Sequence, residues 1–556
     1  MKFFTIVLLA LTFTAPIFGQ DVLTQHNDPA RTGANLHETL LTSGKVKSSF
    51  GKLFSLTVDG QIYAQPLIVN SVDIPGKGTR NVVYVATMKN NVYAFDADDP
   101  NQDCPLWKKN LGRPVPYQLI PINWGSVVGL FNIKPFIGIT ATPVIDPASH
   151  RIWVSVKSYI NDDDLRYYLY ALDFRSGEIL ATSHPIQAGG GDDKLDGKNN
   201  LQRPGILRAN GMIYLAFGSQ QDGGFYHGWV VAFDEQTLEQ KYVFNATPDD
   251  TLGEGGIWQA GNGLASDSQG NVYLMTGNGS FEADKRYGSS FVKLSPELKV
   301  LDWFTPSNYL KLTLLDIDIG SSGPMLIPDS DQLVGGGKQG YFYALNRSGM
   351  GHLQHGNSLA PGEQIFKVSD HWTLDWISWL IPMVGYHHIH GGPVYWNSSQ
   401  RGSLVYIWPE ASALKAYKYD GSTHFQKKAA VVGPKAPKGM PGGFLSISAN
   451  GNQDGLLWAA LPLKDDAFVN IVRGTLRAFD ANTLEQIWST DKSDPEDIFN
   501  FAKYCPPTIA NGKVYLATFS DKLNVYGLTP PPPAIPAWTR TGKKIKKSHG
   551  HGRMRM

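Results

Sequence analysis

A pattern of short strands separated by tight turns recurs along the chain, and it limits the possible folds more than any other feature. The first copy reads AQPLI, VVYVA and VYAFD at residues 64–68, 82–86 and 92–96. Strong copies also occur at residues 142–173, 203–234, 443–488 and 507–526, and weaker copies start near Trp258, Asp318 and His388. Each run alternates apolar and polar residues, which is the period of a strand. Pro66 and Pro507 stand seven steps apart, at about 63 residues per copy, which makes eight copies.

These eight copies predict an all-β protein. A four-stranded unit of this kind cannot bury both faces alone, whereas units stacked side by side in a ring bury them and leave only short edges. A content of 12% aromatic residues, 58 glycines and 35 prolines suits many short strands joined by tight turns. We therefore predict an eight-bladed β-propeller of four-stranded antiparallel blades over residues 49–529. The aspartate that ends each AFD or ALD run is expected to form an Asx turn.

The last copy is incomplete, and this predicts how the ring closes. Four prolines at residues 530–533 follow its third strand, and proline cannot donate a hydrogen bond to a neighbouring strand. At the other end, residues 49–56 read SFGKLFSL and match the pattern of a fourth strand without a blade of their own. We expect this N-terminal strand to pair with the last blade, because closure removes both exposed edges.

The two ends of the chain differ in composition from the repeats. Residues 1–19 contain Lys2, an apolar stretch over residues 3–13 and Gly19, which together indicate a cleaved signal peptide. The apolar stretch is shorter than the roughly 20 residues of a membrane span, so we expect a secreted or periplasmic protein without a transmembrane segment. Residues 20–48 are assigned to an N-terminal extension. Residues 530–556 form a proline-rich linker and a basic tail that is expected to be disordered, and that serves solubility, surface anchoring or weak metal binding.

Charge and cysteine content restrict the partners and the means of stabilisation. The net charge is +1, which gives no global reason to bind nucleic acid or an anionic membrane. Only Cys104 and Cys505 are present, so at most one disulfide can form and the hydrophobic core must stabilise the fold. We expect a monomer.

The repeats resemble those of pyrroloquinoline-quinone (PQQ) proteins, which include the quinoprotein alcohol dehydrogenases. The resemblance rests on tandem VY-AT and VYAFDA units followed by an aromatic strand, and it covers nearly everything from Asp21 to Leu528. Two further motifs, QHNDPARTGAN at residues 25–35 and HHIHGGPVYW at residues 387–396, are similar to a group of exported, uncharacterised PQQ repeat proteins. The repeat itself says little about chemistry, because function depends on sites added to a fold.

The resemblance implies a possible cofactor site for a PQQ- and Ca²⁺-dependent oxidoreductase that acts on an alcohol or sugar. Trp258, in the glycine-rich GGIW run, would stack on the cofactor ring, and Lys338 would bond the cofactor. Asn278, in a TGN run, would bind the metal together with Asp222. Asp318 falls where the family has its catalytic base.

This sequence departs from the family pattern in three ways. Gly223 stands where the metal-binding glutamate is expected, and Asp222 is one residue away from that position. Neighbouring cysteines and a CxxCH haem site are both absent. A purely structural interpretation therefore competes with the cofactor site. In that interpretation Trp258 is a core residue, Asn278 and Asp318 are turn or channel residues, and Lys338 is a solvated turn residue.

The histidines form a second candidate site. His388 and His390 alternate along one strand face, whereas His387 points to the other side. Such a pair suits Zn²⁺ or Cu²⁺ but needs further ligands. Candidates from other blades are His227, Glu254 and Asp318. The competing interpretation is a set of hydrogen-bonded channel histidines.

Two functions remain open from the sequence. The first is a propeller that binds a small-molecule ligand in its channel, as a PQQ-dependent enzyme would. The second is a non-catalytic scaffold that binds a protein or polysaccharide through the aromatic loops at residues 117–135 and 370–386.

Overall fold

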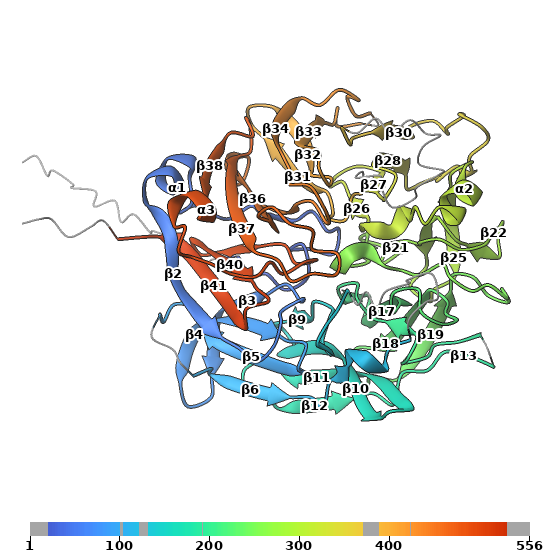
Figure 1. Cartoon of the computed structure of the whole chain (residues 1–556), viewed down its shortest axis with the longest axis horizontal. Coiled ribbons are helices and arrows are strands. Elements are labelled where there is room, and N and C mark those ends of the chain that lie inside the picture. Colours follow the sequence, from blue (N-terminus) through green and yellow to red (C-terminus); the bar gives the residue numbers. More distant parts are fainter. Residues whose placement is uncertain are drawn as a thin grey trace, which may run out of the picture.

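The computed structural model describes residues 20–100, 104–121, 132–191, 193–370, 388–422 and 424–530. Within these residues, eight sheets of four or five strands are arranged in a ring (Figure 1). The chain passes once around this ring, so that its blue beginning and red end meet at β2 and β41. The predicted eight-bladed all-β propeller is therefore confirmed.

The first strand of each blade lies nearest the centre, and the blades follow the chain in order. Blades 1 and 2 consist of β3 (Leu67–Ile74), β4 (Gly78–Ala86), β5 (Asn91–Asp96) and β6 (Trp107–Asn110), and of β9 (Val144–Asp146), β10 (Arg151–Asn161), β11 (Asp164–Asp173) and β12 (Ile179–Thr182). Blades 3 and 4 consist of β16 (Leu207–Ala209), β17 (Met212–Ser219), β18 (Trp229–Asp234) and β19 (Gln240–Asn245), and of β20 (Ala265–Ser266), β21 (Val272–Met275), β24 (Phe291–Leu294) and β25 (Val300–Thr305).

The second half of the ring has the same organisation. Blades 5 and 6 consist of β26 (Met325–Leu326), β27 (Gln332–Gly336), β28 (Tyr341–Asn346) and β30 (Gln364–Lys367), and of β31 (Val394–Ser398), β32 (Gly402–Ile407), β33 (Ala413–Lys418) and β34 (Val431–Lys435). Blades 7 and 8 consist of β35 (Phe444–Asn450), β36 (Gln453–Pro462), β37 (Gly474–Asp480) and β38 (Gln486–Ser489), and of β39 (Thr508–Ala510), β40 (Lys513–Ala517), β41 (Lys522–Leu528) and β2 (Phe50–Thr57).

Short strands and helices are attached to the eight blades. Three of them extend blades: β1 (Ala34–Asn35) pairs with β35, β15 (Asn200–Leu201) with β17, and β29 (His352–Leu353) with β25. Small hairpins are β7 (Val115–Pro116) with β8 (Phe136–Ile137), β13 (Gly189–Gly190) with β14 (Asp193–Lys194), and β22 (Phe281–Glu282) with β23 (Arg286–Tyr287). The α-helices are α1 (Ser43–Ser49), α2 (Tyr309–Leu314) and α3 (Thr490–Ser493). Among the helices of the described ranges, none has the length and apolar character that a membrane span requires.

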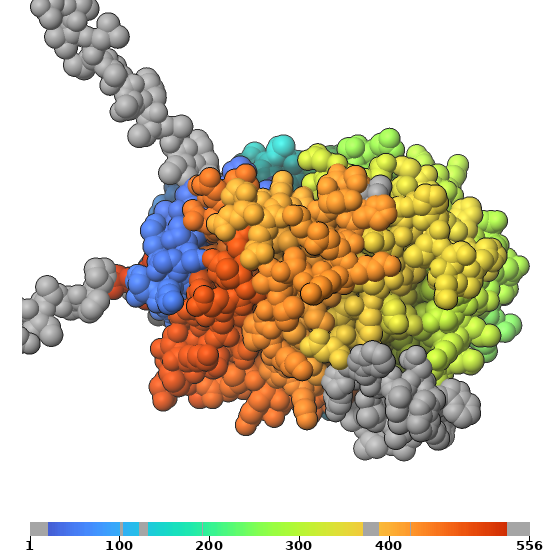
Figure 2. Space-filling view, turned by 90° about the horizontal axis from the view of Figure 1, so that it is seen from above, coloured from blue at the N-terminus to red at the C-terminus, as the bar shows by residue number. Residues whose placement is uncertain are grey.

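The N-terminal strand closes the ring as predicted, one residue later than the sequence pattern placed it. Strand β2 pairs antiparallel with β41, and Phe50 lies opposite Leu528. The strand begins at Phe50 because Ser49 is the last residue of α1. Phe50 then packs against Trp458 and Trp488 of blade 7, at ring-centroid distances of 5.1 and 4.9 Å. Figure 2 shows the blue N-terminal residues against the orange and red last blades.

The extension before β2 binds every blade, a role that the sequence analysis did not assign to it. Between Val22 and Asn35 the chain makes a backbone or side-chain hydrogen bond to the inner part of each blade in turn. From blade 1 to blade 8 the partners are Ile68 with Val22, Ile145 with Leu23, Ile206 with Thr24, Ser266 with Pro29, Leu326 with Ala30, Tyr395 with Thr32, Ile447 with Gly33, and Ile509 with Asn35. The segment from Val22 to Asn35, which includes the QHNDPARTGAN motif, therefore crosslinks the blades through the middle of the ring.

Arg31 is the main polar anchor of this extension. Its guanidinium is 1% exposed and donates hydrogen bonds to the backbone oxygens of Gln25, Ile206 and Leu264 and to the hydroxyl of Thr24, at 2.8 to 3.3 Å. Gly263 makes room for it, because a Cβ at that position would lie 2.4 Å from the guanidinium carbon. A buried arginine is tolerated only when its donors are satisfied in this way.

We predict that Arg31→Met lowers the free energy of unfolding by about 3 to 5 kcal/mol, because it leaves buried carbonyl oxygens without donors and removes the tie between blades 3 and 4. Chemical denaturation measures the loss. Arg80→Met removes an exposed arginine that pairs with Asp96, and it is expected to cost less than about 1 kcal/mol. Equal effects of the two substitutions would contradict the anchoring role of the extension.

The aspartates that end the repeat strands form Asx turns, as predicted. The carboxylates of Asp96, Asp173, Asp234 and Asp480 each accept a hydrogen bond from the backbone N–H two residues later. The two cysteines are free thiols: Cys104 is exposed and Cys505 is buried, so the disulfide that the sequence allowed is not formed.

One lysine is fully buried within the blades. Lys157 on β10 donates to the backbone oxygen of Asn200 at 3.2 Å and lies over the ring of Tyr167. Burial lowers the pKa of Lys157 to about 7. In the unfolded chain its pKa returns to about 10.4, so between these values the unfolded state binds a proton that the folded state lacks.

We therefore predict that the free energy of unfolding rises by about 2 kcal/mol from pH 7 to pH 9 through Lys157 alone. Lys157→Met removes this rise and is expected to stabilise the protein at pH 7. Denaturant titrations at several pH values test this, with Lys299→Met, an exposed lysine, as the matched control. A Lys157→Met variant that keeps the full pH dependence would exclude this assignment.

Candidate functional site

The antiparallel order of the strands brings certain loops to one end of the ring. Within each blade the first strand starts at one end of the ring, and the antiparallel second strand ends there. The loops that precede first strands and the loops that join second to third strands therefore all lie at this end. We call this end the site face. Trp258 and Asp318 precede β20 and β26, while Asp222, Asn278 and Lys338 follow β17, β21 and β27.

Gly277 is the point at which three of these predicted residues meet. A Cβ on Gly277 would lie 2.5 Å from Oδ1 of Asp318 and 2.6 Å from Nε1 of Trp258. The backbone N–H of the next residue, Asn278, donates to the same Asp318 oxygen at 2.8 Å. The absence of a side chain in the TGN run thus allows the indole and the carboxylate to approach the same backbone.

Lys338 forms ion pairs with two aspartates. Its ammonium nitrogen lies 2.6 Å from the buried Asp318 carboxylate and 2.9 Å from the exposed Asp316 carboxylate. Burial by itself raises the pKa of Asp318, but the adjacent Lys338 ammonium outweighs burial and lowers that pKa below its ordinary value. Asp318 is therefore held as a carboxylate. Asp316 was not selected from the sequence, although it lies two residues before Asp318 in the DID run.

The Asn278 amide is only half satisfied. Its Nδ2 donates to Oδ1 of Asp316 at 2.9 Å. Its Oδ1 is buried and accepts no hydrogen bond from any residue that the structure describes. Such an atom costs about 1 to 3 kcal/mol unless a ligand, ion or water satisfies it.

Two further carboxyl groups lie near Asp318. Asp222 accepts a hydrogen bond from the hydroxyl of Tyr226 at 2.7 Å, and desolvation by the surrounding loops together with the Asp318 carboxylate raises its pKa to about 6. Burial, followed by repulsion from Asp222 and Asp318, raises the pKa of Glu254 to about 7. Gly223 cannot carry the family's glutamate here, because its Cβ would lie 2.1 Å from the backbone oxygen of Pro121.

Two cationic groups also lie near Trp258 and Tyr504. The Arg203 guanidinium lies over the rings of Trp258 and Tyr504, at 5.3 and 4.7 Å, and donates to the Trp258 backbone oxygen. Lys503 is buried next to it and donates to two backbone oxygens. The sequence analysis missed both cations. Arg203 was detectable, because it stands directly before the repeat proline where Gln65 occurs in the first copy.

The two histidines do come together, with a third residue that was not foreseen. The rings of His388 and His390 are 5.5 Å apart, and both reach Glu410 in the loop between β32 and β33. They precede β31 rather than forming its start, and His387 lies outside the described residues. Burial lowers the pKa of His390 to about 3 and raises the pKa of Glu410 to about 7.

The three further ligands considered from the sequence make other contacts, and one of them, Asp318, pairs with Lys338. His227 contacts Asp193 through Nε2 and Thr247 through Nδ1, and Glu254 pairs through its backbone with His227 and Gly279. The group of potential ligands in the described residues contains His388, His390 and Glu410 without them. Glu410 gave no signal in the sequence because it belongs to an ordinary turn within blade 6.

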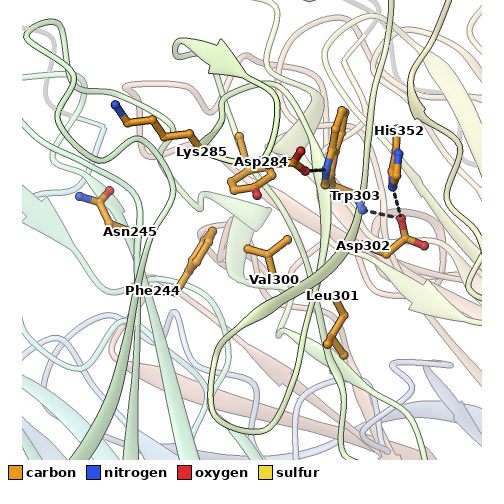
Figure 3. A pocket seen from close by; sticks show the side chains of 10 residues that line it. Phe244, Asn245, Asp284, Lys285, Val300, Leu301, Asp302, Trp303 and His352 are labelled. Carbon is orange, nitrogen blue, oxygen red and sulfur yellow. Dashed lines mark hydrogen bonds and ion pairs between the residues drawn. The ribbon is translucent and has the colours of Figure 1, made fainter.

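A cavity of about 550 Å³ lies on the outer rim rather than at the site face (Figure 3). It opens between β19 and β25, the outer strands of blades 3 and 4, and it contains none of the residues predicted from the sequence. Trp303 stacks on His352 at 4.8 Å and is only 4% exposed, so the cavity offers little aromatic surface to a ligand. The aromatic loops at residues 117–135 and 370–386 lie partly or almost wholly outside the described residues, and their partner role stays a prediction.

Comparisons with known proteins support the fold without showing a family. No family model matches the chain, and no curated protein matches its sequence. Among solved structures, a quinohemoprotein alcohol dehydrogenase from Pseudomonas putida HK5 is 14% identical, with a TM-score of 0.56, and covers 92% of this chain and 82% of its own. The corresponding enzyme from Comamonas testosteroni has 14% identity, a TM-score of 0.55 and the same coverage. A europium-containing methanol dehydrogenase has 13% identity and a TM-score of 0.56, covering 92% and 98% of the two chains. This protein therefore has the propeller fold of the quinoprotein dehydrogenases.

Proposed function

We propose that the site face is the active site of a quinoprotein-like oxidoreductase, which uses PQQ with Ca²⁺ to oxidise an alcohol or a sugar. The observation that carries this proposal is the convergence of Trp258, Asn278 and Asp318 around Gly277. They come from two different blades, and each corresponds to a part that the cofactor chemistry needs. The fold shared with PQQ-type alcohol dehydrogenases is consistent with it.

The residues present fit a cation. The Oδ1 of Asn278 is buried without a partner in the described residues, and oxygen is the ligand that Ca²⁺ prefers. Two carboxylates, Asp316 and Asp318, pair with Lys338, and the carboxyl groups of Asp222 and Glu254 lie near enough to be repelled by both. A divalent cation would satisfy the amide oxygen and reduce the repulsion that, after burial, raises the pKa values of Asp222 and Glu254.

The residues present also fit a flat anionic ring. Trp258 supplies an aromatic surface, and the Arg203 guanidinium over it would pair with a carboxylate of the ring. A cofactor ring that binds here either stacks on Trp258 beside the Arg203 guanidinium or displaces that guanidinium from the indole. When bound, PQQ supplies the electrophilic carbonyl that takes up the two electrons of the substrate.

Asp318 is the residue that accepts the substrate proton in this proposal. Lys338 keeps it ionised through the 2.6 Å ion pair, and the Asn278 N–H holds its second oxygen in place. A base that is already oriented by two donors loses little freedom when substrate binds. Lys338 then stabilises the negative charge that develops next to Asp318.

We predict that PQQ at a hundred times its dissociation constant, added in saturating Ca²⁺, adds about 2.7 kcal/mol to the stability of the full-length protein. Thermal unfolding with PQQ and Ca²⁺, and with PQQ and EGTA, measures the cation-dependent part. Asn278→Ala should abolish that part because it removes the free amide oxygen. Asn110→Ala, on the edge strand β6, is the matched control and should leave it unchanged. Absence of any shift at saturating PQQ and Ca²⁺ would rule out the cofactor site.

We predict further that Asp318→Asn lowers the rate of alcohol oxidation by about 10²- to 10⁴-fold, the usual contribution of a general base. The measurement follows reduction of an artificial electron acceptor by the PQQ-loaded protein. Asp316→Asn removes the other carboxylate bound to Lys338 but leaves the base, so its rate should remain within about tenfold of the parent. An equal loss of rate in both variants would mean that the activity depends on the ion pairs of Lys338 and not on Asp318 as a base.

A further inference from the structure

Three side chains of blade 6 form a compact set of metal-binding atoms. One ligand atom from each of His388, His390 and Glu410 lies within 4.8 Å of the others. The Nδ1 of His388 is 3.6 Å from Oε2 of Glu410, and Nε2 of His390 is 3.1 Å from Oε1. Two ligands at about 2.1 Å from one tetrahedral metal are separated by about 3.4 Å, so these distances match atoms that share an ion.

Two of these atoms have no hydrogen bond among the described residues. Nε2 of His390 and Oε1 of Glu410 face each other, yet their alignment is too poor for a hydrogen bond. Their side chains are only 7% and 4% exposed, so bulk water does not satisfy them. Each such buried atom costs about 1 to 3 kcal/mol, which an ion bound between them would offset.

Residues of blades 4, 5 and 6 hold the backbone around the histidines. Nδ2 of Asn262 donates to the oxygen of His390, and the Ser321 hydroxyl donates to the oxygen of Ile389. The N–H of Glu410 donates to the oxygen of His388, which ties the two ligand-bearing loops together. A metal site needs this support, because its ligands must keep their geometry before the ion arrives.

We propose that His388, His390 and Glu410 bind one divalent transition metal, of the class of Zn²⁺, with the remaining coordination positions open to the site face. Two imidazoles and one carboxylate are a ligand set of transition-metal sites that retain an open position, whereas Ca²⁺ prefers oxygen ligands alone. The proposal is independent of the PQQ site, since it uses none of the residues at positions 222, 258, 278 or 318.

The experiment loads metal-depleted full-length protein with Zn²⁺, removes excess metal by gel filtration and measures the metal content by mass spectrometry. We expect one equivalent in the parent and, with Co²⁺ as the probe, visible absorption bands of nitrogen and oxygen ligation. His390→Asn and Glu410→Gln preserve approximate shape and should weaken Zn²⁺ binding by about 100-fold or more. Circular dichroism and thermal unfolding establish that each variant is folded.

Two controls separate this site from other sources of metal binding. His352→Ala removes another histidine that contacts a carboxylate, that of Asp302 on the rim, and it should retain the parent stoichiometry. A His549→Ala, His551→Ala double variant should also retain it, which excludes the basic tail. Less than about a tenth of an equivalent in the parent, or unchanged binding in folded His390→Asn and Glu410→Gln, would overturn the proposal.

Discussion

Hydrogen bonds between the N-terminal extension and all eight blades hold the propeller together at its centre. A blade packs mainly on its two neighbours, so a ring without further ties behaves as a chain of nearest-neighbour contacts. Here the segment from Val22 to Asn35 touches the inner part of each blade in sequence order, and β2 then joins the last blade to the first part of the chain. The inner strands are thereby held at fixed positions.

Fixed inner strands position the site face, because the loops that carry Trp258, Asp318 and the two histidines lead directly into them. The remaining site loops follow second strands, which pair with the inner strands. Asn262 links the extension to the site face. Its side-chain oxygen accepts a hydrogen bond from Gln25 of the extension, and its side-chain nitrogen donates one to the backbone oxygen of His390. Groups of both charges lie on this face. Asp316 and Asp318 pair with Lys338, while Arg203 lies over Trp258 and Tyr504, and Lys503 lies over Tyr504. Such a surface suits a ligand that combines a cation with an anionic ring.

Much of the site could be inferred from the sequence because the repeats place equivalent loops at one end of the ring. Trp258, Asn278, Asp318 and Lys338 were selected by likeness to a family, and the first three meet at Gly277. Glu410 was not selected, since a turn glutamate carries no spacing signal and its partner histidines lie about twenty residues earlier. Whether the site residues act as proposed depends on ligands, which neither pattern nor fold specifies.

The number of blades, the order of strands, the Asx turns and the strand that closes the ring could all be predicted from the sequence. These features follow from local rules, namely the two-residue period of strands, the turn chemistry of aspartate and glycine, and the need to cover exposed edges. The folded structure was needed to show that the segment from Val22 to Asn35 contacts all eight blades and that Glu410 meets His388 and His390. Those contacts join residues from different loops or blades, and their partners are chosen by the three-dimensional path of the backbone rather than by any local pattern.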